Sequence, residues 1–77
     1  MEKREALAEV SHEIWAHWMN YLFSVGYEDE FGGLIIPARY YERWQRQAFT
    51  TYTKLTEREK NSDREQADKI LAVLEGD

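Results

Sequence analysis

The sequence lacks cysteine altogether, contains a single proline, and has no apolar run of the 18 residues typical of a membrane-spanning helix. The absence of cysteine excludes disulfides, thiol chemistry and cysteine-ligated zinc sites. The sequence also shows no signal-peptide pattern. With 32% charged residues and little proline or glycine, the composition is not that of a disordered tail. We therefore expect a folded cytoplasmic protein without a membrane segment.

The sequence also has no excess of basic residues, since the formal net charge of the 77 residues is −5. Binding to DNA or RNA in general requires a basic surface, so the charge argues against that class. The length predicts one domain over residues 1–77, and a chain this small gains little net stability from its core. We therefore expect a homo-oligomer, a ligand or tight helix packing to add stability.

Aromatic side chains, in contrast, are abundant, with three Trp, five Tyr and three Phe. Large rings in a small protein serve a core, an interface or a stacking platform.

The periodicity of apolar residues predicts an all-α fold of three helices, over residues 2–25, 37–49 and 63–74. The connector 26–36 contains three acids and Gly32-Gly33, which favour a loop or a brief hairpin. Pro37 suits the first position of the second helix.

The region that follows the second helix is expected to turn, because Thr50–Thr53 disfavour helix. Both Thr56 with Glu59 and Ser62 with Glu65 have the spacing of a capping box. We therefore expect one short helical turn over 57–60 and a separate third helix. Its buried stripe would consist of Ala67, Ile70, Leu71 and Leu74.

The first helix is apolar over a wider arc than packing on one side requires. At about 100° per residue, its apolar side chains form two stripes. The first stripe is Leu7, Val10, Ile14, Trp18, Tyr21 and Val25, and the second is Ala8, His12, Trp15, Met19 and Phe23. Either the other helices wrap both stripes, or the second stripe forms an oligomer seam or lines a pocket.

The second helix carries an arginine row, because Arg39, Arg43 and Arg46 share one face. The opposite face, with Tyr41, Trp44 and Ala48, is the expected packing side. One interpretation is a solvated face whose arginines pair with the acidic connector. The other is an anion site, since guanidinium groups bind phosphates and carboxylates in bidentate geometry and neighbouring rings can stack on a base.

Catalytic and metal sites find no support in the sequence. His12 and His17 are five residues apart, which places them on different faces of a helix, so they do not chelate one metal ion. We expect no enzyme activity, no metal and no cofactor.

Both ends of the chain resemble the RyR domain, the repeat named after the ryanodine receptor. The N-terminal match is LAEVSHEIW at 7–15, and the C-terminal match is YTKLTEREKNSDREQADKILAVL at 52–74. The middle, LIIPARYYERWQRQAFT at 34–50, is longer and more aromatic than the usual connector of that family. It is similar to short stand-alone proteins of phages and prophages, which implies a bacterial host cell.

The resemblance implies a helical domain that recognises nucleotide-derived ligands. Trp15 would then be a stacking residue, and Asp63 and Arg64 would shape or brace the pocket wall. Without the resemblance, Asp63 is a helix cap and Arg64 an exposed partner of Asp68.

The resulting hypothesis is a non-enzymatic binding protein for an anionic, nucleotide-like small molecule, which would sequester a host signalling nucleotide. Its expected ligand-binding residues are Trp15, Arg39, Arg43, Trp44, Tyr52, Asp63 and Arg64. In this scheme the tryptophans stack on the base, the arginines hold phosphate oxygens and Tyr52 orients the ligand. The alternative is a protein-interaction module that uses the apolar aromatic face of the first helix. Nucleic-acid binding through the arginine row is the third and least favoured hypothesis.

Overall fold

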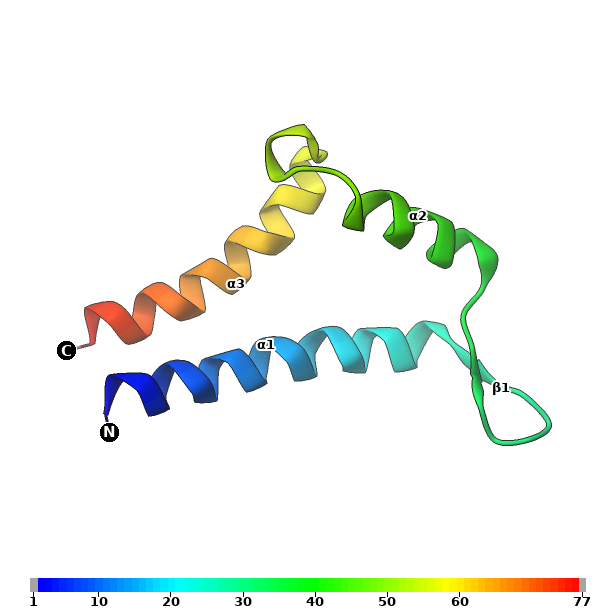
Figure 1. The fold of residues 1–77 in the computed structure, drawn as a ribbon, viewed down its shortest axis with the longest axis horizontal. Helices are drawn as coiled ribbons and strands as arrows, with labels where there is room; N and C mark the ends of the chain where they lie inside the picture. Colours follow the sequence, from blue (N-terminus) through cyan, green and yellow to red (C-terminus); the bar gives the residue numbers. More distant parts are fainter. Residues whose placement is uncertain (1, 77) are drawn as a thin grey trace. The chain divides into compact units, whose positions relative to one another are not determined.

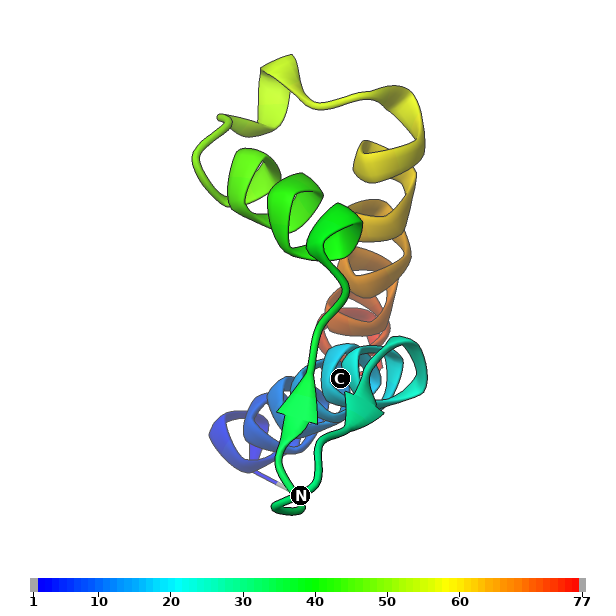
Figure 2. The ribbon, with the colours of Figure 1, turned by 90° about the vertical axis from the view of Figure 1, so that its right-hand side faces the viewer.

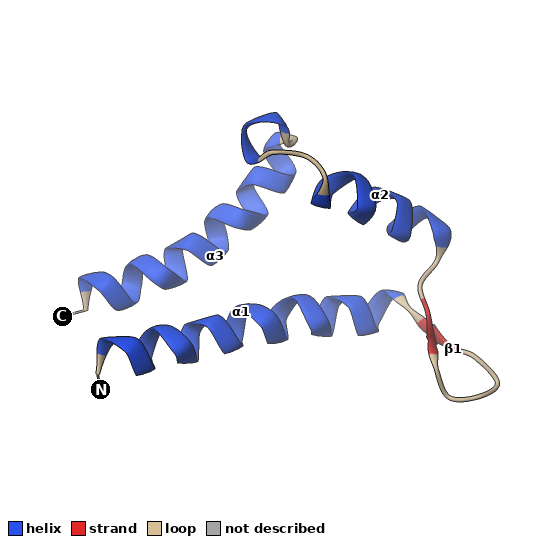
Figure 3. Cartoon of the chain, viewed as in Figure 1, coloured by secondary structure: helices blue, strands red, loops and turns tan. Residues whose placement is uncertain are grey.

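The computed structural model describes residues 2–76 and confirms an all-α protein with a small hairpin (Figure 1). Along the chain the elements are α1 (Lys3–Val25), β1 (Tyr27–Glu28), β2 (Leu34–Ile35), α2 (Ala38–Ala48), the 3-10 helix η1 (Tyr52–Lys54) and α3 (Glu57–Glu75). Figure 3 shows the predominance of helix and the single strand pair between α1 and α2.

Contacts within the chain divide it into two compact units. The first comprises Met1–His17 and Thr56–Asp77, and the second is Trp18–Leu55. Helix α1 contributes residues to both units. The expectation of a single domain over residues 1–77 stays a prediction.

Helix α1 forms as the sequence predicts, because no proline or glycine interrupts Lys3–Val25 and Glu5 lies in its first turn. The helix ends at Val25, and the N–H of the following Gly26 donates to the carbonyl of Leu22 at 3.1 Å. A Cβ atom at Gly26 would lie only 2.7 Å from Cγ of Leu34. Glycine therefore allows the chain to leave α1 and pack directly against the second strand.

The connector is a hairpin, in which Tyr27 pairs with Ile35 and Glu28 with Leu34 in antiparallel register (Figure 2). The carboxylate oxygen Oδ1 of Asp29 accepts hydrogen bonds from the N–H groups of Phe31 and Gly33, each at 2.8 Å. Gly32 has a φ of 83°, in the left-handed region that favours glycine. One side chain and one glycine thus order the tip of the hairpin.

Helix α2 begins one residue later than predicted, since Pro37 is its N-cap rather than its first residue. The carbonyl of Pro37 accepts from the N–H groups of Tyr40 and Tyr41 at 3.0 and 3.2 Å. At the other end, the hydroxyl of Thr50 donates to the carbonyl of Arg46 at 2.6 Å.

The packing side of α2 differs from the predicted one. Tyr40, Trp44 and Gln47 are half-buried, whereas Tyr41 is 52% exposed and Ala48 is exposed. The reason is that Tyr40 and Trp44 lie one turn apart and Trp44 contacts Tyr21 of α1. This contact turns α2 so that Tyr41 faces solvent.

Helix α3 is one continuous helix, and the predicted break near residue 61 is wrong. Its N-terminus is the Thr56–Glu59 capping box, in which the Glu59 N–H donates to the Thr56 hydroxyl oxygen at 3.2 Å and the Thr56 N–H to Glu59 Oε1 at 3.1 Å. Neither Gly nor Pro follows before Gly76, so nothing stops the helix at Ser62. Asp63 therefore lies inside the helix rather than at its cap.

Few side chains are buried. Among the described residues these are Val10, Leu55 and Gln66, with 8%, 9% and 7% exposure. The predicted buried stripe of α3 is wrong, because Ala67, Ile70, Leu71 and Leu74 are all exposed. The inward side of α3 is instead the polar row Ser62, Gln66 and Lys69 together with Val73. At about 100° per residue, this row lies roughly a third of a turn from the aliphatic stripe, which the rotation of α3 leaves in solvent.

No helix within residues 2–76 combines the length and apolar character that crossing a bilayer requires.

Candidate functional site: an aromatic–arginine cluster

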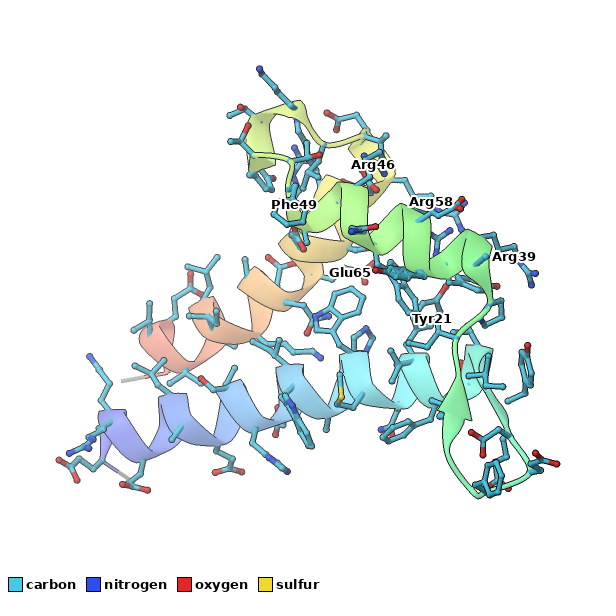
Figure 4. The ribbon with its side chains drawn as sticks, turned by 45° about the vertical axis from the view of Figure 1, so that its right-hand side comes forward. Tyr21, Arg39, Arg46, Phe49, Arg58 and Glu65 are labelled. Carbon is cyan, nitrogen blue, oxygen red and sulfur yellow. The ribbon has the colours of Figure 1, made fainter. Side chains whose placement is uncertain are left out.

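The unit Trp18–Leu55 contains a cluster of three rings and two guanidinium groups at its surface. Tyr21 comes from α1, and Arg39, Tyr40, Arg43 and Trp44 come from the first two turns of α2. We call these five residues the aromatic–arginine cluster. Figure 4 shows Tyr21 extending from α1 toward α2, and Arg39 at the beginning of α2.

The three rings of the cluster meet at Trp44. Its centroid lies 5.9 Å from that of Tyr21, with an interplanar angle of 59°, and 5.6 Å from that of Tyr40, with an angle of 39°. Tilted rings at such separations attract one another through their quadrupoles. Trp44 and Tyr40 are half-buried while Tyr21 is 40% exposed, so solvent reaches part of each ring.

Both guanidinium groups lie against the ring of Tyr40. The Cζ atom of Arg39 is 4.7 Å from the ring centroid and that of Arg43 is 5.2 Å from it, which is cation–π range. Nη2 of Arg43 also donates to the hydroxyl oxygen of Tyr21 at 3.4 Å, a long hydrogen bond. These contacts orient the two cations without neutralising them.

The predicted pairing of this arginine row with the acidic connector is not formed by Arg39 or Arg43. Within residues 2–76, neither of these guanidinium groups has a carboxylate partner, and Glu28 and Glu30 of the hairpin have no ion pair. The third member, Arg46, lies in the last turn of α2. Arg39 and Arg43 thus keep their full charge toward solvent.

Two members of the cluster, Tyr21 and Tyr40, were not among the predicted site residues. Tyr40 has a local signal, because it precedes Trp44 by four residues and lies beside Arg39 and Arg43 on the helix surface. Tyr21 has none, since its apolar stripe predicts core packing and its contact with Trp44 joins residues far apart in the sequence.

The predicted stacking residue Trp15 lies in the other unit, on the second stripe of α1. Its ring is 58% exposed and stacks on His12, with centroids 5.8 Å apart and planes at 27°. Phe23 of the same stripe is also 58% exposed, whereas Val10 of the first stripe is buried. The interpretation of α1 as a helix wrapped on both stripes is therefore wrong.

Asp63 and Arg64 also belong to that unit, on α3. Nη1 of Arg64 donates to Oε2 of Glu57 at 3.1 Å and to Oδ1 of Asn61 at 2.8 Å. The alternative pairing with Asp68 is not formed, because Asp68 has no ion pair within residues 2–76. Helical side chains lean toward the N-terminus, so Arg64 reaches back to the first turn rather than forward to Asp68.

The first turns of α3 hold a local charge network around Glu57. Nζ of Lys60 lies 3.6 Å from its Oε1 atom, and Arg64 contacts its other oxygen. The hydrogen bond from Arg64, then the charges of Arg64 and Lys60, lower the pKa of the Glu57 carboxyl. Asp63 is half-buried within α3.

The structure brings together three of the seven predicted site residues, Arg39, Arg43 and Trp44. Tyr52 lies in the same unit, in η1 beyond the end of α2, and is 46% exposed. No group of three or more His, Asp or Glu side chains within residues 2–76 is placed to hold a metal ion.

Comparisons with known proteins give no match: no family model, no curated protein and no solved structure is similar to this chain. The resemblance to RyR domains, with what it implies, stays a prediction.

Proposed function

We propose that the aromatic–arginine cluster binds an anionic, nucleotide-like small molecule without transforming it. The observation that carries the proposal is that Arg39 and Arg43 hold two exposed guanidinium groups beside one ring, and neither has a carboxylate partner among residues 2–76. Guanidinium groups form strong, paired hydrogen bonds with phosphate oxygens.

The contacts that these arginines already make favour an exchange for a ligand. The hydrogen bond from Arg43 to Tyr21 is long at 3.4 Å, and Arg39 contacts only the face of a ring. An arriving phosphate would therefore displace only the long hydrogen bond of Arg43 and supply charge-assisted ones, which are about twice as strong as neutral hydrogen bonds. The cation–π contacts restrict both side chains beforehand, which lowers the entropic cost of binding.

The rings next to the arginines suit the flat part of a nucleotide. Stacking of a base on an aromatic side chain contributes about 1–3 kcal/mol, whichever base is present. Tyr21, at 40% exposure, offers the most accessible ring surface of the three, and Trp44 supports it from behind. The proposed ligand thus stacks on Tyr21, which Trp44 supports, and directs its phosphates to Arg39 and Arg43.

Binding of this kind would act by sequestration, in which the protein at stoichiometric concentration lowers the free ligand. The proposal of sequestration builds on the resemblance of the middle segment to stand-alone phage and prophage proteins. We propose a host signalling nucleotide as the ligand that this chain would sequester.

The test is calorimetry and thermal-shift screening of the full chain with cyclic nucleotides and ADP-ribose derivatives. A ligand at about 100 times its Kd should add about 2.7 kcal/mol to the free energy of unfolding. The double variant Arg39→Gln, Arg43→Gln should abolish the shift. Arg4→Gln is the matched control, because Arg4 is exposed and has no partner among the described residues. No shift with any compound at millimolar concentration would contradict the proposal.

A second candidate function is recognition of another protein through the second stripe of α1. The specific observation is that Trp15 and Phe23 are each 58% exposed on one helix face. Amphipathic helices bind partner helices or grooves through apolar residues at such spacing.

Substitution of Trp15 by Glu separates the two candidate functions. If the stripe is an interface, this variant should lose a complex or oligomer detected by light scattering, while nucleotide binding persists. If Trp15→Glu leaves every assembly intact, the second candidate is wrong. Ala8→Glu on the same stripe provides a second charge that removes no ring.

A further inference from the structure

The unit Trp18–Leu55 separates its charges into two segments of opposite sign. Residues 26–37, which include the hairpin, carry three acids and no base, for a net charge of −3. Residues 38–54, which include α2, carry four bases and only Glu42 as an acid, for a net charge of +3. Opposite charges of equal size in neighbouring segments would ordinarily be expected to pair.

The two segments do not neutralise one another within the chain. Glu28 and Glu30 are exposed and without an ion pair among residues 2–76, and Arg39 and Arg43 have no carboxylate there. Asp29 is engaged otherwise, since its Oδ1 atom accepts from two backbone N–H groups of the turn. Both halves of a complementary pair are therefore displayed and unused.

Each segment also displays aromatic surface, but only on the hairpin does it adjoin the charges used here. Phe31, at the tip of the hairpin and next to Glu30, is 88% exposed, the highest value among the exposed large hydrophobic residues. On the side of α2, Tyr41 is 52% exposed and Phe49, just beyond the helix end, is 86% exposed. Figure 4 shows Arg39 and Phe49 at opposite ends of α2.

We propose that the hairpin of one copy docks on α2 of a second copy, and the reverse, in a closed dimer. Glu28 and Glu30 would pair with Arg39 and Arg43 of the other molecule. Because every copy carries both surfaces, a two-fold axis forms the same contact twice and leaves no unsatisfied end. Hydrogen bonds of Asp29 order the hairpin tip before docking, which lowers the entropic cost.

A second copy fits these surfaces better than a nucleic acid does. A polyanion would be attracted by Arg39 and Arg43 but repelled by the adjacent hairpin acids. A second copy instead supplies carboxylates for the arginines and guanidinium groups for the acids in one arrangement. The inference does not depend on ligand binding by the cluster, but the hairpin carboxylates of a second copy and the phosphates of a ligand would compete for the same two guanidinium groups.

The primary test is sedimentation of the full chain at low and high salt over a range of concentrations. The dimer should form at low salt and weaken at least tenfold in 0.5 M salt, because exposed charge pairs are screened. A monomer at all concentrations would overturn the proposal, as would an affinity that does not change with salt.

Charge-reversal variants test the proposed ion pairs directly. Glu28→Lys with Glu30→Lys should abolish the dimer, and so should Arg39→Glu with Arg43→Glu. An equimolar mixture of the two variants should restore it, since each then offers the charges that the other requires. Failure of the mixture to associate, with both variants helical by circular dichroism, would overturn the proposal.

The matched control is Glu9→Lys with Glu13→Lys, which makes the same change of charge at two exposed positions of α1. This variant should dimerise as the unmodified chain does. If it dissociates equally, the effect is one of net charge and the proposed contact is wrong. Glu28→Lys with Glu30→Lys leaves the cluster intact, so its nucleotide binding reports separately on the proposed function.

Discussion

The charged residues of α3 and those of α2 show two different uses of arginine. On α3, Arg64 contacts Glu57 and Asn61 of its own helix, and Lys60 shares the same carboxylate. On α2, Arg39 and Arg43 contact rings and have no carboxylate partner among residues 2–76. The first arrangement stabilises a helix, whereas the second leaves positive charge available for a partner. The number of arginines in a segment is thus less informative than the partners that surround them.

The largest expected loss of stability comes from removing Trp44, the ring at which the aromatic–arginine cluster meets. Trp44→Ala deletes contacts with both Tyr21 and Tyr40. Since Trp44 is half-buried, we expect a loss of about 2–3 kcal/mol in the free energy of unfolding, somewhat below the range for a fully buried ring. Chemical denaturation measures it, and Trp15→Ala, at an exposed ring, should cost much less. Equal losses would contradict the supporting role of Trp44.

Replacing the arginines of α2 and of α3 in turn tests which of them contribute to the affinity for an anionic ligand. Arg39→Gln with Arg43→Gln removes two charge-assisted contacts and should weaken binding of an anionic ligand about 100-fold or more by calorimetry. Arg64→Gln should leave the affinity unchanged, because that guanidinium contacts Glu57 and Asn61. A comparable loss in Arg64→Gln would show that α3 takes part in binding.

The capping box of α3 should produce a smaller effect on stability. Thr56→Ala removes a side-chain acceptor at the helix N-terminus and should cost about 1 kcal/mol in the free energy of unfolding. Ser62→Ala is the matched variant, since its sequence spacing is the same but it lies within the helix. Ser62→Ala should be neutral or slightly stabilising because alanine has the higher helix propensity. A cost at Ser62 equal to that at Thr56 would indicate a second helix start.

The smallest effect is a pH dependence from the network around Glu57. Its pKa is lowered in the folded chain by Arg64 and Lys60, so the stabilisation is present above the usual pKa of 4.5 and is lost as the pH falls through the lowered value. The melting temperatures of the unmodified chain and Glu57→Gln should therefore differ at pH 7 and converge in acid. Melting temperatures that stay apart in acid would contradict this prediction.

The sequence predicts the elements that depend on local pattern and fails where two local patterns are equivalent. An uninterrupted apolar periodicity is sufficient for α1. Thr56 with Glu59 and Ser62 with Glu65 have identical spacing, however, and only the continuity of α3 shows that the first pair alone forms a cap. For α2, aromatic residues at positions 40, 41 and 44 allow more than one inward face.

The residues of the candidate site likewise fall into those with a local sequence signal and those without one. The arginine row is visible as a helical spacing, so Arg39 and Arg43 were predicted. Tyr21 was not, because its contact with Trp44 is tertiary and no local pattern indicates it. The lack of a carboxylate partner is likewise a property of the folded chain, since a sequence with acids nearby suggests the opposite.

Gln66 is a buried polar residue whose hydrogen bonding is incomplete in a protein with few buried side chains. This residue is only 7% exposed, and its amide oxygen Oε1 has no donor among the described residues. A buried acceptor without a hydrogen bond costs about 1–3 kcal/mol relative to a satisfied one. A substitution at this position is therefore expected to raise the free energy of unfolding. Methionine has a similar length and lacks the unsatisfied oxygen, so Gln66→Met is the replacement we would choose for a more heat-resistant chain.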